Sequence, residues 1–237
     1  MADYLTSNIR NIALMGHGGE GKTTLTEAML VAAGIIDRQG KVEDGTTVTD
    51  FEPEENKRKC SISAACAPID WNGKMLNVID VPGYFDFIGE MVGPLRVVET
   101  ACIVVSGVTG FNVGAEKAFK HAVKSGVGRM FVINQMDREH ASFDKVTQQL
   151  RDRHGSCVVP VLMPIGEGAD FRGVVNVLEK KAYEGAYKNS VEIPMPDNMK
   201  DKVDKAFEYL TEQAAAADDD LMMKYLDEGE LNYDEIL

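Results

Sequence analysis

Residues Gly16 to Thr23 spell GHGGEGKT, which fits the pattern GxxxxGK[ST] between a short apolar run and an amphipathic stretch. Glycines let backbone N–H groups close around phosphate oxygens, and the start of the next helix adds positive potential. We therefore expect a phosphate-binding loop in which Lys22 reaches the β- and γ-phosphates and the Thr23 hydroxyl binds Mg²⁺. The other residues expected to line the nucleotide are Gly16, His17, Gly18, Gly19, Glu20, Gly21 and Thr24. For His17, packing within the loop is favoured over catalysis.

Apolar runs and helical stripes alternate on both sides of this loop. Strands are predicted at 9–15, 62–71, 74–79, 101–105 and 130–133, with Asn72-Gly73 as a hairpin turn. Helices are predicted at 22–33, 88–98, 115–123 and 142–153. This order predicts an α/β fold: a doubly wound, mostly parallel sheet with one antiparallel edge hairpin, the core of a P-loop domain over residues 1–155.

The pattern changes near residue 156. A strand is predicted at 158–163, one or two more within 173–187, a long helix around 199–210 and a shorter one around 221–226. Residues 156–237 are therefore expected to form a small α+β insert. Asn232 and Glu235 have the spacing of a helical capping box, and the chain stops at Leu237, about one turn later. From this we expect that the sequence is cut from a longer protein, before the end of the nucleotide-binding domain.

Composition limits the possible partners. The chain has 237 residues and a net charge of −13, so it lacks the basic excess typical of a domain that grips nucleic acid directly. No apolar run is long enough to cross a membrane, and the N-terminus has no signal-peptide pattern. The four cysteines show no metal-binding spacing, and free thiols are typical of a cytoplasmic protein.

Two further motifs concern the nucleotide. Asp80, at the end of an apolar strand, can hold Mg²⁺ through water, and Gly83 can offer its backbone N–H to the γ-phosphate. The sequence NQMD, residues 134–137, ends a later apolar strand. There Asp137 can accept hydrogen bonds from guanine N1–H and N2–H₂, which adenine does not offer, while Asn134 holds the loop. The pair of motifs favours GTP and GDP over adenine nucleotides.

With these motifs the chain resembles the translational GTPases, and most closely the nucleotide-binding domain of elongation factor G and its paralogues. The resemblance covers essentially the whole chain and includes TDFEPEENKRKCSIS, NVIDVPGYFDFIGE, VINQMDRE and MPIG followed by DFRGVVNVL. It implies that Ser61 closes on Mg²⁺ and the γ-phosphate beside Thr23 and Asp80. It also implies GTP hydrolysis, with a ribosome as partner of the full-length protein.

The departures from the family pattern affect hydrolysis and base binding. Tyr84 stands where the family has a histidine that helps to orient the attacking water, as in the paralogue group. Gln135 replaces a lysine whose stem covers the base, and Gly19 replaces a common aspartate. Gly18 and Cys60 occupy the positions of two larger apolar residues. The family's Ser-Ala loop near the base has no match after residue 188.

Three interpretations follow. The first is a GTP-binding switch domain with GTPase activity, slow in isolation, in which Lys22, Gly83 and Tyr84 act on the transferred phosphoryl group. The second is a GTP-binding module with little or no hydrolysis, because of Tyr84 and Gln135. The third is a non-translational P-loop kinase or ATPase, for which no arginine-rich lid or acceptor site is found.

Overall fold

The computed structural model describes residues 4–186 and 189–236. The chain forms two compact units, residues 1–135 and 136–237. The predicted boundary between the nucleotide-binding core and the insert, at residue 155, stays a prediction. The two compact units divide earlier, after residue 135. Helix α4 (Phe143–His154) falls in the second unit, where its Phe143 packs against the hydrophobic core.

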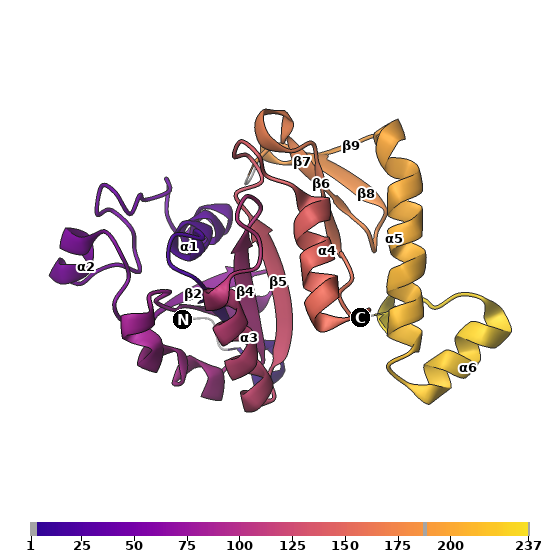
Figure 1. Ribbon diagram of the computed structural model, residues 1–237, viewed down its shortest axis with the longest axis horizontal. Helices are drawn as coiled ribbons and strands as arrows, with labels where there is room; N and C mark the ends of the chain where they lie inside the picture. The colour runs from indigo at the N-terminus through magenta and orange to yellow at the C-terminus, as the bar shows by residue number, and fades with distance from the viewer. Residues whose placement is uncertain (1–3, 187–188, 237) are drawn as a thin grey trace. The chain divides into compact units, whose positions relative to one another are not determined.

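The first unit is built on a five-stranded sheet in the order β2-β3-β1-β4-β5 (Figure 1). The central strand β1 (Ile9–Gly16) runs parallel to β3 (Lys74–Asp80) and to β4 (Thr100–Ser106). Strand β5 (Gly128–Asn134) is parallel to β4, and β2 (Ala65–Trp71) pairs antiparallel with β3 at the other edge. The predicted doubly wound sheet with one antiparallel hairpin is confirmed.

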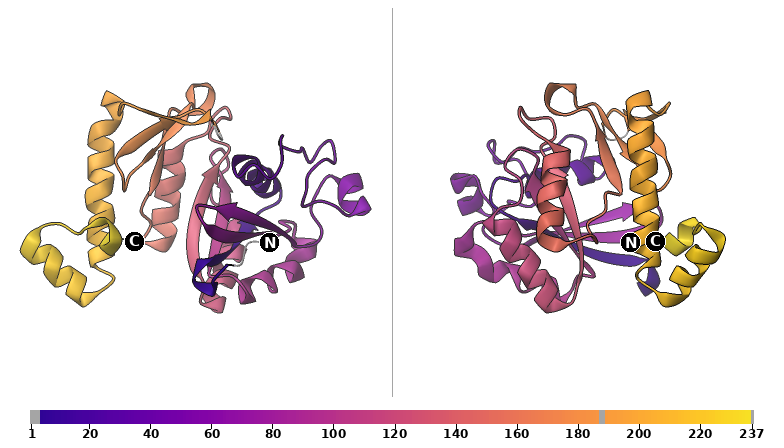
Figure 2. Two further views of the ribbon diagram at one scale, coloured as in Figure 1. Left: turned by 180° about the vertical axis from the view of Figure 1, so that it is seen from behind. Right: turned by 45° about the vertical axis from the view of Figure 1, so that its right-hand side comes forward.

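Helices cover both faces of this sheet, with α1 (Lys22–Ala32) on one face and α3 (Val113–Ser125) on the other (Figures 1 and 2). Strand side chains alternate between the faces. Leu14 packs in a core cluster with Leu30 of α1, whereas Phe131 stacks on Phe119 of α3 with ring centroids 5.7 Å apart. The parallel strands therefore end together where the loops to α1 and α3 begin, which is the usual place for a ligand in such folds.

The shorter elements described in the first unit are the 3₁₀ turn η1 (Thr6–Asn8), helix α2 (Pro53–Arg58), and two pieces in a segment that the sequence analysis predicted wrongly. The helix predicted at 88–98 is two 3₁₀ pieces, η2 (Phe85–Met91) and η3 (Pro94–Arg96). Pro94 has no N–H for an α-helical bond, and glycines are poor helix formers. Met91 and Leu95 are nevertheless buried, so the apolar spacing gave the buried face correctly.

The second unit has a four-stranded antiparallel sheet in the order β6-β7-β8-β9. Its elements after α4 are β6 (Leu162–Ile165), η4 (Gly168–Asp170), β7 (Gly173–Asn176), β8 (Lys181–Glu184), β9 (Val191–Ile193), α5 (Asp197–Ala215), α6 (Asp219–Glu228) and α7 (Tyr233–Ile236). Strand β6 begins later than predicted, after Pro160, which cannot donate to a strand ladder. Val203 and Leu210 of α5 join the core formed by the sheet.

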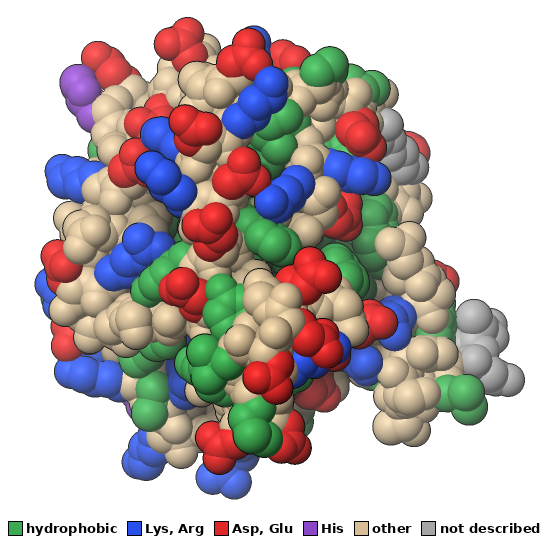
Figure 3. All heavy atoms as spheres, turned by 90° about the vertical axis from the view of Figure 1, so that its right-hand side faces the viewer, with side chains coloured by type: hydrophobic (Ala, Val, Ile, Leu, Met, Phe, Trp, Pro, Cys, Tyr) green, Lys and Arg blue, Asp and Glu red, His purple; other side chains and the backbone are tan. Residues whose placement is uncertain are grey.

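The predicted capping box is present at the start of α7. The backbone N–H of Glu235 donates to Asn232 Oδ1 (3.1 Å), and the Asn232 N–H donates to Glu235 Oε2 (2.9 Å). No helix within the described residues is long and apolar enough to cross a membrane. Acidic and basic side chains are interspersed over the face of the protein seen in Figure 3.

Candidate functional site

In the loop between β1 and α1, backbone carbonyls surround the ammonium group of Lys22. Lys22 is 6% exposed, and its ammonium donates to the carbonyl of His17 (2.7 Å) and to that of Gly16 (3.4 Å). Burial lowers the pKa of Lys22, while the charge of Asp80 opposes this change. Gly21, the N-cap of α1, has φ of +85°, a conformation that favours glycine. The loop thus holds a buried cation beside the first N–H groups of a helix, an arrangement suited to an anion.

Hydroxyl and carboxylate groups from three segments meet next to this lysine. Thr23 Oγ1 lies 3.1 Å from Ser61 Oγ, and Thr49 Oγ1 donates to Asp80 Oδ2 (2.9 Å). Asp80 ends β3 and is 1% exposed. Burial raises the pKa of Asp80 to about 6, and hydrogen bonds from Thr23 and Thr49 partly counter this rise.

Asp50 is a second buried carboxylate in this cluster. It accepts a hydrogen bond from Thr47 (3.2 Å), and burial raises its pKa. One oxygen of each carboxylate, Oδ1 of Asp50 and Oδ1 of Asp80, is buried without a hydrogen-bond partner among the described residues. Buried carboxylate oxygens without partners are costly, and hard oxygen donors are the ligands that Mg²⁺ takes. The donor set therefore fits Mg²⁺, with Asp50 and Thr49 as members that sequence reasoning missed.

The segment carrying Ser61 is held in place by two fully buried glutamates that were also missed. Glu27 of α1 accepts from the backbone N–H of Gly40 (2.8 Å) and of Val48 (2.6 Å). Glu55 accepts from the N–H of Ile62 (2.8 Å) and of Ser63 (3.1 Å). These bonds fix a stretch that otherwise has little regular structure. A faint signal existed for Glu55, which stands three residues after Glu52 in a capping box with Pro53 at the first helical position.

Gly83 and Tyr84, which follow β3, lie directly against the loop. A Cβ atom added at Gly83 would be 2.3 Å from Lys22 Nζ and 2.6 Å from the Gly18 nitrogen. Only glycine fits at that position. The Tyr84 ring covers Gly18, although the side chain as a whole is 46% exposed. Cys60, the other position with a smaller residue than the family pattern, is partly buried, and burial raises the pKa of its thiol.

His17 and Glu20 tie the loop to its surroundings. The His17 ring lies 5.5 Å from the Phe85 ring, and a Cβ added at Gly114 would be 2.7 Å from His17 Cα. His17 is thus closely packed, and its Nδ1 is buried without a hydrogen-bond partner among the described residues, so the packing role stays a prediction. Glu20 is 4% exposed and accepts from Asn112 Nδ2 (2.6 Å), the N-cap residue of α3. Burial raises the pKa of Glu20, and the hydrogen bond from Asn112 opposes the rise.

The residues expected near the base fall on both sides of the boundary between the units. Asn134 ends β5, and its Nδ2 donates to the Glu20 carbonyl (2.8 Å). Gln135 donates to the Gly19 carbonyl (2.9 Å). Asp137 belongs to the second unit, where it is exposed in a turn. Thr24 is exposed on α1, and its carbonyl accepts a hydrogen bond from Gln39 (2.8 Å).

Comparison with known proteins agrees with this geometry. Residues 7–230 match the elongation factor Tu GTP binding domain family. An elongation factor G-like protein of Thermotoga maritima is 36% identical over 230 residues, which are 97% of this chain and 32% of that protein. A crystal structure of a Thermus thermophilus protein superposes with a TM-score of 0.90 at 33% identity, over 97% of this chain and 34% of the other. The chain spans about a third of the length of both relatives. It belongs to the elongation factor Tu GTP-binding domain family.

Proposed function

We propose that this chain is the GTP-binding switch domain of an elongation-factor-G-like translational GTPase. It binds GTP or GDP with Mg²⁺ in the cytoplasm and hydrolyses GTP when its full-length protein acts on the ribosome. The observation that carries the proposal is the cluster of Thr23, Ser61 and Asp80 beside Lys22, with Gly83 packed on the same lysine. This cluster connects two segments to the phosphate loop: the one before β2, with Ser61, and the one after β3, with Gly83. A site that senses the γ-phosphate requires such connections.

The chain's own residues have distinct parts in this mechanism. Lys22 exchanges the carbonyls of Gly16 and His17 for the β- and γ-phosphate oxygens, and its buried charge stabilises the transition state. Thr23 and Ser61 would hold Mg²⁺ directly, with Asp80 and Asp50 accepting from its waters. When bound, the ion neutralises charge that develops on the β- and γ-oxygens. Gly83 offers its N–H to the γ-phosphate, which a side chain at that position would block.

Guanine selectivity is assigned to Asn134 and Asp137. Asn134 braces the loop through the Glu20 carbonyl, and Asp137 accepts from the Watson–Crick edge of guanine. Gln135, fixed on the Gly19 carbonyl, covers the base less well than the lysine of the family. Guanine nucleotides should therefore bind more weakly, but selectivity for guanine does not depend on Gln135.

A second candidate, a GTP-binding module with little hydrolysis, is favoured by one observation. Tyr84 lies over Gly18, where it covers the loop and offers a phenol instead of an imidazole. A phenol is a much poorer general base than an imidazole at neutral pH. Single-turnover hydrolysis by the full-length protein, with and without ribosomes, separates the two candidates, since only the first predicts stimulation.

The test of the proposed site is nucleotide titration by calorimetry, with and without Mg²⁺. GDP should bind at least about 100-fold more tightly than ADP, since a site built to pair a hydrogen-bonding edge rejects a ligand that lacks it. The variant Ser61→Ala should weaken binding of a non-hydrolysable GTP analogue about tenfold in Mg²⁺ and leave GDP binding unchanged, with Ser63→Ala as the matched control. Equal affinities for GDP and ADP would refute the proposal and favour the interpretation of the chain as a P-loop kinase or ATPase.

A further inference from the structure

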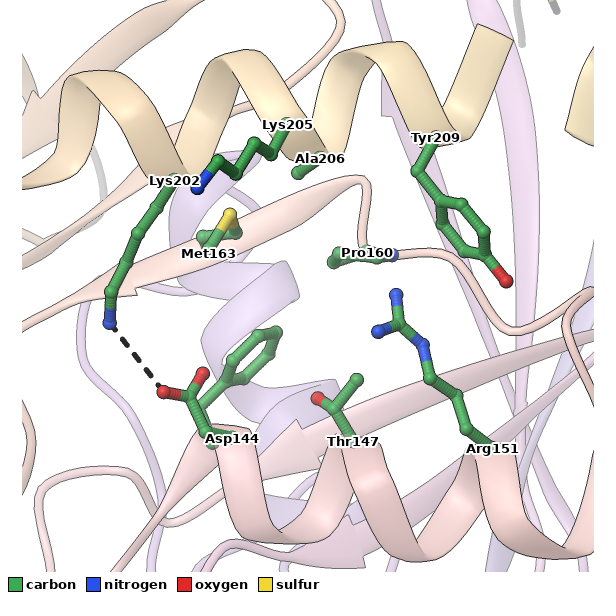
Figure 4. A pocket seen from close by; sticks show the side chains of 10 residues that line it. Asp144, Thr147, Arg151, Pro160, Met163, Lys202, Lys205, Ala206 and Tyr209 are labelled. Carbon is green, nitrogen blue, oxygen red and sulfur yellow. Dashed lines mark ion pairs between the residues drawn. The ribbon is translucent and has the colours of Figure 1, made fainter. Parts of the chain in front are cut away.

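A cavity of about 370 Å³ lies wholly within the second unit, far along the chain from the phosphate loop. Figure 4 shows α5 along one side, α4 along the other, and the segment with Pro160 and Met163 between them. Helix α4 supplies Asp144, Thr147 and Arg151, at positions that share one helical face. The size is that of a small-molecule site, and none of the residues that line it takes part in the proposed GTP mechanism.

The charge of the cavity is opposite to that of the chain. Three cations, Arg151, Lys202 and Lys205, line it against the single carboxylate of Asp144, while the whole chain carries −13. Only Lys202 is paired with Asp144, at 3.5 Å, and both side chains are more than half exposed. The cavity therefore keeps an excess of positive charge that favours an anion.

Arg151 is positioned in advance for such a ligand. Its Nε donates to the Val158 carbonyl (3.0 Å), and its guanidinium lies 4.8 Å from the centre of the Tyr209 ring. Tyr209 is itself fixed by a hydrogen bond to the Ser156 carbonyl (2.6 Å). In Figure 4 the two terminal nitrogens of Arg151 point into the cavity. A guanidinium fixed through Nε retains its other donors for a bidentate contact with an oxyanion.

A buried hydroxyl lies between the charged groups. Thr147 is 9% exposed, and its Oγ1 is buried without a hydrogen-bond partner among the described residues. Figure 4 shows the Thr147 side chain between those of Asp144 and Arg151, on the side of α4 that lines the cavity. Lys205, on the opposite helix, likewise has no ion-pair or hydrogen-bond partner within the described part of the chain. Thr147 of α4 and Lys205 of α5 thus bring donors without partners to the lining of the cavity from its two helices.

The remaining walls are apolar or aromatic, from Met163, Ala206, Pro160 and Phe143. We propose that the cavity binds a small organic anion, with a phosphate or carboxylate group held by Arg151, Lys205 and Thr147 and a compact apolar body against these walls. A few polar groups within a mainly apolar lining are typical of ligand sites.

Phenyl phosphate is a suitable probe, and its binding can be monitored by two-dimensional amide NMR of this chain. Saturating GDP and Mg²⁺ are present throughout, so that the phosphate loop is already occupied. We expect saturable shifts of amides in α4 and α5 with a Kd of about 1 mM or tighter, a modest value for a ligand of this size. Benzoate in a parallel titration distinguishes a carboxylate from a phosphate preference. Inorganic phosphate should bind more weakly than phenyl phosphate, because it lacks the apolar body.

Variants separate a built site from a general ionic effect. Lys205→Met should weaken phenyl phosphate binding about fivefold to tenfold, whereas Lys145→Met, the same change at an exposed position of α4 outside the cavity, should change it less than about twofold. Thr147→Val should weaken binding without lowering the melting temperature, and Thr147→Ser should bind as the native chain does. Three results would each overturn the proposal: no saturable shift, equal effects of the two lysine variants, or inorganic phosphate binding as tightly as phenyl phosphate.

Discussion

The Tyr84 ring lies against the backbone of Gly18 so closely that a Cβ atom added at Gly18 would be 2.8 Å from the ring's Cζ. The two residues come from different segments, the phosphate loop and the turn after β3. Each residue therefore limits what the other can be: a side chain at position 18 requires the ring to move, and the ring keeps its place because position 18 has no side chain.

A double-mutant cycle should show this dependence. Gly18→Val alone should lower the free energy of unfolding by about 1–2 kcal/mol, because the new side chain displaces the ring. In a Tyr84→Ala background the same change should cost clearly less, which gives a coupling energy of about 1 kcal/mol in denaturant titrations. Gly93→Ala is the control, since a Cβ there meets nothing within 4 Å. Additive effects at Gly18 and Tyr84 would contradict the packing described.

Hydrolysis provides a separate test of Tyr84. If the phenol limits the reaction, Tyr84→His should raise the ribosome-stimulated single-turnover rate of the full-length protein without changing GDP affinity, since comparable switches gain about 10³–10⁵ from an added catalytic group. Tyr84→Phe removes only the hydroxyl. If Tyr84→Phe hydrolyses GTP as fast as the native protein in every condition, the hydroxyl has no catalytic part and the ring acts by packing alone.

Base recognition is tested at Asp137. Asp137→Asn should lower GDP affinity at least about 100-fold and shift preference toward xanthine nucleotides, because the amide offers a donor where guanine presents donors. Glu139→Gln, two residues further and highly exposed, removes a similar charge and should leave GDP affinity within about twofold. Calorimetric titration with GDP and XDP checks both. An unchanged GDP affinity in Asp137→Asn would remove this residue from the base site.

The sequence predicted the parts of this site that follow local rules. The glycine loop, Asp80 and Asn134 all stand at strand ends, where the alternation of apolar runs and helices places them together. Glu27 and Asp50 escaped prediction because their partners are backbone N–H groups and hydroxyls in a segment without periodicity, whose path depends on the folded unit. The segment 88–98 showed the opposite error, since its apolar spacing was helical but Pro94 excluded a continuous α-helix.

Asp80 should make stability depend on pH in the metal-free, nucleotide-free protein. Its pKa is about 6 when folded against an ordinary value of 3.8, so the folded state binds a proton that the unfolded state releases. The contribution of Asp80 to the free energy of unfolding therefore falls as pH rises from about 4 through about 6, by up to about 3 kcal/mol. Asp80→Asn should remove this contribution, so that stability falls less over this range in the variant than in the native chain, while the raised pKa values of Asp50 and Glu20 act in both. The variant should be more stable than the native chain at pH 7.5, but not at pH 4. Denaturant titrations across this range test it, with exposed Asp86→Asn as the control.

The glutamate that fixes the segment before α2 gives the last prediction. Glu27 is completely buried and accepts two backbone hydrogen bonds, from Gly40 and Val48. Glu27→Ala removes the acceptor of both N–H groups, and each lost hydrogen bond costs about 0.5–1.5 kcal/mol of stability. Much of this loss should fall on the segment itself, because it has few other backbone bonds, so local opening should become more frequent while the sheet stays folded.

Trypsin can report that opening, since Lys41, Lys57, Arg58 and Lys59 lie in or beside the segment. Glu27→Ala should be cleaved there at least about tenfold faster than the native chain, under conditions in which circular dichroism still shows the folded state. Glu43→Ala, an exposed glutamate in the same segment, should be cleaved at the native rate. GTP analogue with Mg²⁺ should slow cleavage of both variants, because Ser61 then gains a ligand. Equal cleavage of Glu27→Ala and Glu43→Ala would mean that the segment is held by its remaining contacts and that the buried carboxylate is dispensable.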